Sequence, residues 1–132
     1  MKSKVSSGLT PHLQSALRMA AAVIFIAHGT QKMFGVPGSP FHLPALPTTL
    51  LGVAGVLETV GGALMLLGLF TRPVAFVLAG EMAVAYVMRH APGGPWPIVN
   101  GGDLAVLFCF LWLFFCAAGP GPWSLDALRK GK

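Results

Sequence analysis

The chain has 132 residues, of which 55% are hydrophobic and only 10% are charged. A soluble domain usually carries about 25% charged residues, so this chain has too few charged side chains to cover a folded surface in water. Together with a mean hydropathy of +0.73, this composition excludes an ordinary soluble domain. It predicts an integral membrane protein with one domain, residues 1–132.

The net charge of +5 comes from nine basic and four acidic residues. Because the basic residues are scattered singly among apolar runs and form no stripe, we expect no nucleic-acid partner. Cys109 and Cys116 share one apolar segment and match no zinc or CxxC spacing. We therefore expect buried thiols, with neither a disulfide nor a metal site.

Four apolar stretches each approach the roughly 20 residues that a helix needs to cross a bilayer. They predict an all-α membrane protein, an antiparallel bundle of four transmembrane helices, with spans at about residues 12–34, 48–70, 72–90 and 99–119. Residues 35–47 hold four of the eleven prolines and predict a surface loop. The short link before Pro73 makes the second and third helices antiparallel neighbours. The third turn is expected at residues 91–102.

The run GPGP ends the fourth span and begins a tail, residues 120–132. Ser124 is a candidate N-cap for a short interfacial helix in this tail. That helix would place apolar side chains opposite charged ones, which is typical of a segment lying at a membrane surface. The two sets are Trp123, Leu125 and Leu128 against Asp126, Arg129 and Lys130.

The distribution of Lys and Arg predicts the orientation of the chain in the cytoplasmic (inner) membrane, because cytoplasmic ends of spans carry the excess. One side collects Lys2, Lys4, Arg72, Arg129, Lys130 and Lys132, whereas the other has only Lys32 and Arg89. Both termini are therefore predicted to be cytoplasmic. Arg18 lies close to that side, where we expect its side chain to reach the lipid phosphates.

Three of the four acidic residues, Glu58, Glu81 and Asp103, fall within the second, third and fourth spans. A charged group there costs roughly 2.5 kcal/mol or more, and such residues mark sites or ion pairs. The first span adds His28 and Lys32, one helical turn apart. With a rise of about 1.5 Å per residue, all five lie within roughly 15 Å of the non-cytoplasmic side, which predicts a polar pocket opening outward.

Three interpretations of these groups stay open. An excess of carboxylates at low dielectric leaves at least one Glu protonated, able to donate or relay a proton to a hydroquinone or other phenolic head group. Alternatively, the charges join the helices by satisfying one another, or they line an ion pathway. His28 has no second histidine on its helix face, so we expect a hydrogen-bonding histidine and no haem or metal ligand.

Several motifs in order resemble the DoxX family of small four-helix membrane proteins. They are HGTQKMFG at 28–35, LETVGG at 57–62, LGLFTR at 67–72, NGGD at 100–103 and GPGPWSLD at 119–126. The resemblance runs from about Arg18 to Asp126, nearly the whole chain. At Asp103 the family often has Glu, so this chain keeps the carboxylate chemistry with a shorter reach.

The resemblance implies a quinone-interacting component of a membrane redox or oxidative and thiol-stress system. Members are linked to quinone-coupled oxidation of sulfur compounds and to complexes with soluble redox enzymes, so such enzymes are expected partners. It establishes no enzymatic activity; any would belong to an oxidoreductase subunit coupled to the quinone pool. The candidate ligand or proton-handling residues are Glu58, Glu81, Asp103, His28, Lys32 and Asn100.

No cofactor motif is present in the chain, so any redox centre would come from a diffusible lipid, such as a membrane quinone, or from a partner protein. We also expect a homo-oligomer in the bilayer. The alternative function is a non-enzymatic membrane scaffold or assembly factor that recruits soluble redox partners, its buried charges being structural.

Overall fold

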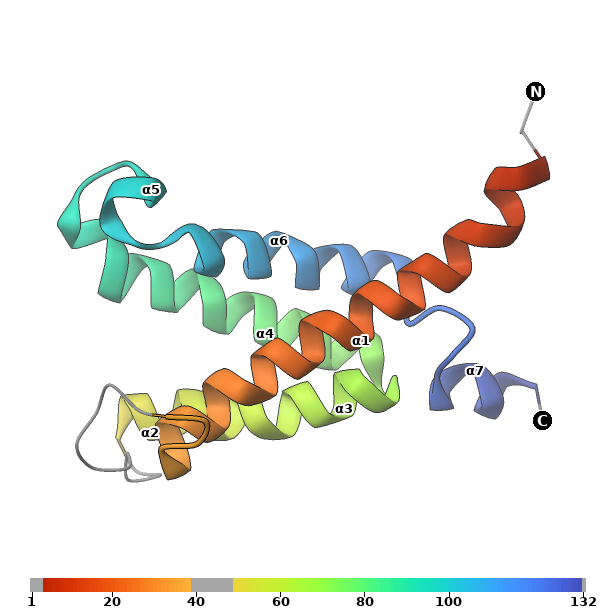
Figure 1. The fold of residues 1–132 in the computed structure, drawn as a ribbon, viewed down its shortest axis with the longest axis horizontal. Coiled ribbons are helices and arrows are strands. Elements are labelled where there is room, and N and C mark those ends of the chain that lie inside the picture. The colour runs from red at the N-terminus through yellow and green to blue at the C-terminus, as the bar shows by residue number, and fades with distance from the viewer. Residues whose placement is uncertain (1–3, 39–48, 132) are drawn as a thin grey trace. The chain divides into compact units, whose positions relative to one another are not determined.

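The computed structural model describes residues 4–38 and 49–131, with side chains for 8–38 and 49–131, and these residues form helices and no strand (Figure 1). Residues 39–47 of the predicted loop lie outside the described residues. In chain order the elements are α1 (Lys4–Phe34), α2 (Leu50–Val56), the π-helix η1 (Leu57–Gly61), α3 (Gly62–Leu67), α4 (Thr71–Ala85), the π-helix η2 (Tyr86–His90), the 3-10 helix η3 (Ala91–Gly93), α5 (Pro97–Asn100), α6 (Asp103–Ala118) and α7 (Leu125–Lys130).

Three continuous helical stretches are long and apolar enough to cross a membrane: Gly8–Phe34, Leu50–Leu67 and Thr71–Gly93. The prediction of an all-α membrane protein is therefore confirmed. The fourth apolar helix, α6, has 16 residues and extends about 24 Å, less than the roughly 30 Å of a bilayer core. The predicted number of four spans stays a prediction.

The chain divides into two compact units, Met1–Thr71 with Pro120–Lys132, and Arg72–Gly119. In the first unit α1 runs antiparallel to the continuous stretch α2–η1–α3. Gly55 lies against Met33 near the end of α1, whereas Gly62, further along its own helix, lies against Ile26. Both glycines are buried, so the second span approaches α1 closely through small residues, as is common between helices in membranes.

The buried guanidinium of Arg18 holds the other end of this unit together. Its Nε donates to the carbonyl of Pro120 at 2.9 Å, Nη1 donates to Met65 and, at 2.8 Å, to Leu66, and Nη2 donates to Trp123. The side chain has no exposed surface. The prediction that Arg18 reaches the lipid phosphates is wrong, because carbonyls at the end of α3 and in the tail satisfy its donors inside the protein.

Asp126 fastens α7 to the turn that precedes α4. Its N–H donates to the carbonyl of Gly68, and its carboxylate accepts the N–H groups of Phe70 at 2.9 Å and Thr71 at 2.8 Å. Partial burial acts to raise the pKa of Asp126, but the hydrogen bonds from Thr71 and Phe70 and the charge of Arg129 outweigh it and hold that pKa below its usual range. The carboxylate thus stays ionised where it caps α4.

The tail forms the predicted helix, and its predicted N-cap is confirmed. Ser124 has extended backbone geometry and its Oγ accepts the N–H of Ala127 at 3.1 Å. Because α7 has only six residues, this cap and the bonds of Asp126 must supply the stability that its own length does not.

In the second unit, α4–η2 and α6 form an antiparallel pair. Arg72 at the start of α4 donates to the carbonyls of Cys116, at 3.0 Å, and Ala117, both at the end of α6. At the opposite end of the pair, Tyr86 in η2 meets Asn100, just before α6 begins. A cation at the carbonyl end of α6 is also favourable to its helix dipole.

We expect Arg18→Lys to destabilise the protein strongly, because one ammonium group cannot reach the four carbonyls of α3 and the tail that the guanidinium binds. Each lost charge-assisted hydrogen bond costs roughly 1.5 to 3 kcal/mol, so the midpoint of thermal unfolding in detergent should fall by several degrees. Arg89→Lys, at an exposed arginine, is the matched control and should leave the midpoint unchanged. Equal midpoints for the two variants would contradict this role of Arg18.

We expect Gly29→Ala to disrupt the packing of α1 on η1. An added Cβ would lie 2.6 Å from the backbone nitrogen of Thr59 and 2.8 Å from the carbonyl oxygen of Gly55, so backbone would have to move, at a cost of about 1 to 3 kcal/mol. Gly80→Ala is the control, since an added Cβ there meets nothing within 4 Å. Thermal unfolding should show a loss for the first variant and none for the second.

Candidate functional site

An ion pair joins α1 to η1 inside the membrane-spanning part of the first unit. Lys32 Nζ lies 2.5 Å from Glu58 Oε2, and the two side chains are 18% and 4% exposed. Removal of two charges from water costs several kcal/mol for each ion, so such a pair persists only when the partners satisfy each other. These residues are therefore held in a fixed position by each other.

Local helix geometry brings the two charges together. Glu58 lies in η1, where the π-helical turn accommodates one more residue than an α-helical turn does. Lys32 lies in the last turn of α1. Gly29 is buried against Thr59 and Gly55, so the two helices approach closely one turn from the pair. Single-turn π-helices occur frequently at functional sites, and this one contains the buried carboxylate.

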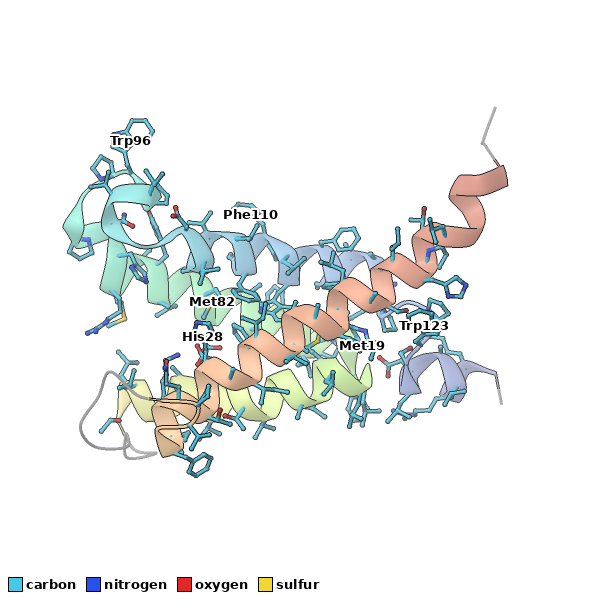
Figure 2. All side chains as sticks on the ribbon, in the orientation of Figure 1. Met19, His28, Met82, Trp96, Phe110 and Trp123 are labelled. Carbon is cyan, nitrogen blue, oxygen red and sulfur yellow. The ribbon has the colours of Figure 1, made fainter. Side chains whose placement is uncertain are left out.

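His28 stands one turn before Lys32 on α1 and is labelled in Figure 2. Its Nδ1 lies 2.9 Å from the carbonyl oxygen of Ile24. Since a carbonyl oxygen can only accept, Nδ1 carries the proton in this bond, and the neutral ring then offers Nε2 as an acceptor. His28 thus lies one helical turn from the Lys32–Glu58 pair. The three groups together provide an ammonium donor, a carboxylate and an imidazole acceptor.

An open, mainly apolar hollow of about 320 Å³ extends from His28 along one face of α1. Val23 and Ile24, which line it, are 55% and 48% exposed, so the hollow opens sideways from the helix. Gln31 donates from Nε2 to the carbonyl of Gly38, which fixes the turn that closes the hollow. The lining residues are Val23, Ile24, Ala27, His28, Gln31 and Pro37.

The remaining predicted site residues belong to the second unit. Glu81 lies in α4 with both carboxylate oxygens buried, and Asp103 is the exposed first residue of α6. The structure thus brings together Lys32, Glu58 and His28. Participation of Glu81 and Asp103 in the same pocket stays a prediction.

The Asn100 side chain bonds the turn that leads into α6. Its Nδ2 donates to Tyr86 Oη at 3.2 Å and to the carbonyl of Gly94 at 2.9 Å, and its Oδ1 accepts the N–H of Gly102 at 2.8 Å. These bonds give Asn100 a structural task. Whether it also contacts a ligand stays a prediction.

Sequence reasoning missed Tyr86 and His90, which accompany Asn100. Their rings stack with centroids 6.3 Å apart, and His90 Nδ1 lies 3.1 Å from the carbonyl of Asn100. Tyr86 is the single tyrosine of the chain, and His90 follows it by four residues, a signal that could have found them. Within residues 4–38 and 49–131, no three His, Cys, Asp or Glu residues gather to hold a metal ion.

Comparison with known families shows which family the chain belongs to. The DoxX family profile matches residues 13–91, which contain Lys32, Glu58 and His28. The chain belongs to the DoxX family. An uncharacterized protein of Haemophilus influenzae is 44% identical over 120 residues, covering 88% of this chain and 90% of its own length. No solved structure matches this DoxX protein.

Two other relatives carry descriptive names. The "Inner membrane protein YphA" of Escherichia coli is 32% identical over 127 residues, covering 88% of this chain and 89% of that protein. The "Putative oxidoreductase CatD" of Bacillus subtilis is 35% identical over 80 residues, covering 58% of this chain and 60% of that protein. This DoxX protein is thus membrane-embedded, with relatives in the inner membrane.

We expect the Lys32–Glu58 pair to show strong coupling in a double-mutant cycle. Lys32→Met leaves a buried carboxylate without its cation, which costs roughly 3 to 5 kcal/mol. The double variant Lys32→Met/Glu58→Gln removes both charges and should recover much of that loss, as measured by thermal unfolding in detergent. Additive effects of the two single changes would show that the pair contributes no coupling.

Proposed function

We propose that this DoxX protein binds the head group of a membrane quinone, or of a related phenolic, beside the Lys32–Glu58 pair. The observation that carries the proposal is a buried ion pair on a π-helical turn, one helical turn from a histidine that lines a laterally open hollow. A polar site with an apolar slot, inside a membrane span, suits a ligand that is itself dissolved in the bilayer.

The donor and acceptor types match this head group. A quinone carbonyl needs a hydrogen-bond donor, which the Lys32 ammonium provides, and a phenolic hydroxyl needs an acceptor, which His28 Nε2 or Glu58 provides. Val23, Ile24 and Pro37 would pack against the ring. A volume of about 320 Å³ lies at the lower end of the range for small-molecule sites.

The name of the Bacillus subtilis relative supports a redox context, although it describes that protein. The proposal accordingly places this chain in a membrane redox or stress system, with electrons supplied by the quinone pool or by a partner enzyme. The second candidate is a scaffold whose ion pair joins α1 to η1. It is favoured by the position of the pair in the tightly packed contact of those two elements.

We expect ubiquinone-1 or menadione, titrated onto the detergent-purified protein, to raise its unfolding midpoint by several degrees in a saturable manner. Glu58→Gln and His28→Leu should each remain folded but lose this shift, measured against the variant's own midpoint without quinone. Arg89→Gln, at an exposed arginine, is the matched control and should keep the full shift.

The scaffold function predicts a different pattern. No quinone would shift the midpoint of the wild-type protein or of either variant. A shift that persists in both Glu58→Gln and His28→Leu would place quinone binding elsewhere and would overturn the site.

A further inference from the structure

The first unit presents an apolar and basic surface that the proposed head-group site does not use. Three large side chains on it are exposed: Phe70 by 50%, Trp123 by 54% and Leu128 by 67%. Arg129 and Lys130, which follow directly on α7, are exposed as well. We call these five residues the tail surface; Figure 2 labels Trp123, and Figure 1 shows α7.

The connectivity of the chain places the tail surface at the boundary of the membrane. The turn at residues 68–70 joins Leu50–Leu67 to Thr71–Gly93, and both stretches are long and apolar enough to cross. A turn between two such helices lies at a membrane surface. Asp126 bonds directly to this turn, through Gly68 and Phe70, so α7 lies at the same surface.

Contacts within the first unit hold three residues of the tail surface in place: Trp123, Phe70 and Arg129. The carbonyl of Trp123 accepts from Arg18, and its N–H donates to Ser15 Oγ at 3.1 Å. The ring of Trp123 packs against His12, with centroids 5.2 Å apart. Arg129 lies over the ring of Phe70 at 5.0 Å. A ligand would therefore meet side chains that are already ordered, which lowers the entropic cost of binding.

Apolar and cationic groups adjoin on this surface as they do in a phospholipid-binding site. A hollow of about 220 Å³ is lined by Leu69, Leu125 and Leu128, and Arg129 forms its charged side. Asp126, the one acidic residue of segment 120–131, binds backbone N–H groups at the start of α4 and also interacts with the charge of Arg129, so two cations of this segment stand against one carboxylate. The charges of Arg129 and Lys130 thus favour an anion, and the leucines favour an acyl chain.

We propose that the tail surface binds an anionic phospholipid of the leaflet next to the turn at residues 68–70. The lipid phosphate binds Arg129 at the edge of the hollow, with the charge of Lys130 adding to the attraction, and the acyl chain occupies the hollow beside Leu125 and Leu128. Trp123 and Phe70 flank the glycerol region, where aromatic rings are typical of membrane proteins.

The full-length protein in detergent tests this with dioleoylphosphatidylglycerol and, at equal concentration, dioleoylphosphatidylcholine. Native mass spectrometry should show phosphatidylglycerol retained in preference, and the unfolding midpoint should rise with it alone. Arg129→Gln/Lys130→Gln should weaken phosphatidylglycerol binding by roughly thirtyfold, because each basic residue near an anionic surface contributes about 1 kcal/mol.

Two controls test whether binding depends on the charges of the tail surface and not on the total charge of the protein. Arg129→Lys/Lys130→Arg keeps both charges and should retain binding, and Arg89→Gln removes an exposed arginine of the second unit and should retain it too. Equal retention of both lipids, or undiminished binding by the double Gln variant, would overturn the proposal. Stabilisation by inorganic phosphate alone would overturn the lipid as its ligand. None of these outcomes depends on quinone binding.

Discussion

The guanidinium of Arg18 is the interaction on which the first unit depends most. It binds carbonyls of α3 and of the tail, segments that lie about fifty and one hundred residues away along the chain. Because the guanidinium is buried inside the protein, no water competes for these carbonyls, and each buried acceptor left without a donor costs about 1 to 3 kcal/mol. One side chain thus satisfies the last carbonyls of α3 and also holds the tail against α3.

The same principle recurs at other helix ends. Asp126 caps the start of α4 with an anion, and Arg72 caps the end of α6 with a cation, each matching the sign of the helix dipole. Charged residues near the ends of spans are usually interpreted as signals for orientation in the membrane. In this chain Arg18, Arg72 and Asp126 also provide the hydrogen bonds that the exposed helix ends require.

Composition and the length of the apolar runs sufficed to predict the all-α membrane fold, because apolar runs of sufficient length have few other stable conformations in a bilayer. The cap at Ser124 followed from local chemistry as well. The hydrogen-bond partners of Arg18 could not be predicted in this way, because tertiary structure brings their carbonyls near its guanidinium. The site was predictable in part: spacing placed His28 and Lys32 on one face of a helix, whereas the choice of Glu58 as partner required the register of α1 against η1.

Asn100 shows a second limit of sequence reasoning. A polar residue at the start of an apolar span is a natural candidate for binding a ligand. The Asn100 amide instead donates hydrogen bonds to the carbonyl of Gly94 in the surrounding turn and to the hydroxyl of Tyr86. Residue type alone does not separate these two roles. The hydrogen bonds of Asn100 within the turn distinguish the two roles, and they form only when residues 86 to 102 fold together.

The direction in which Glu58 points depends on the π-helical turn η1, in which it lies. A π turn contains one residue more than α-helical geometry needs, and one residue in an α-helix corresponds to a rotation of about 100°. Loss of any single residue from Leu57–Gly61 could restore a regular α-helix and rotate one half of the span relative to the other. The carboxylate and the glycines that pack α3 on α1 would then no longer face α1 together. The number of residues in Leu57–Gly61, as much as their identity, therefore decides whether the Glu58 carboxylate faces α1.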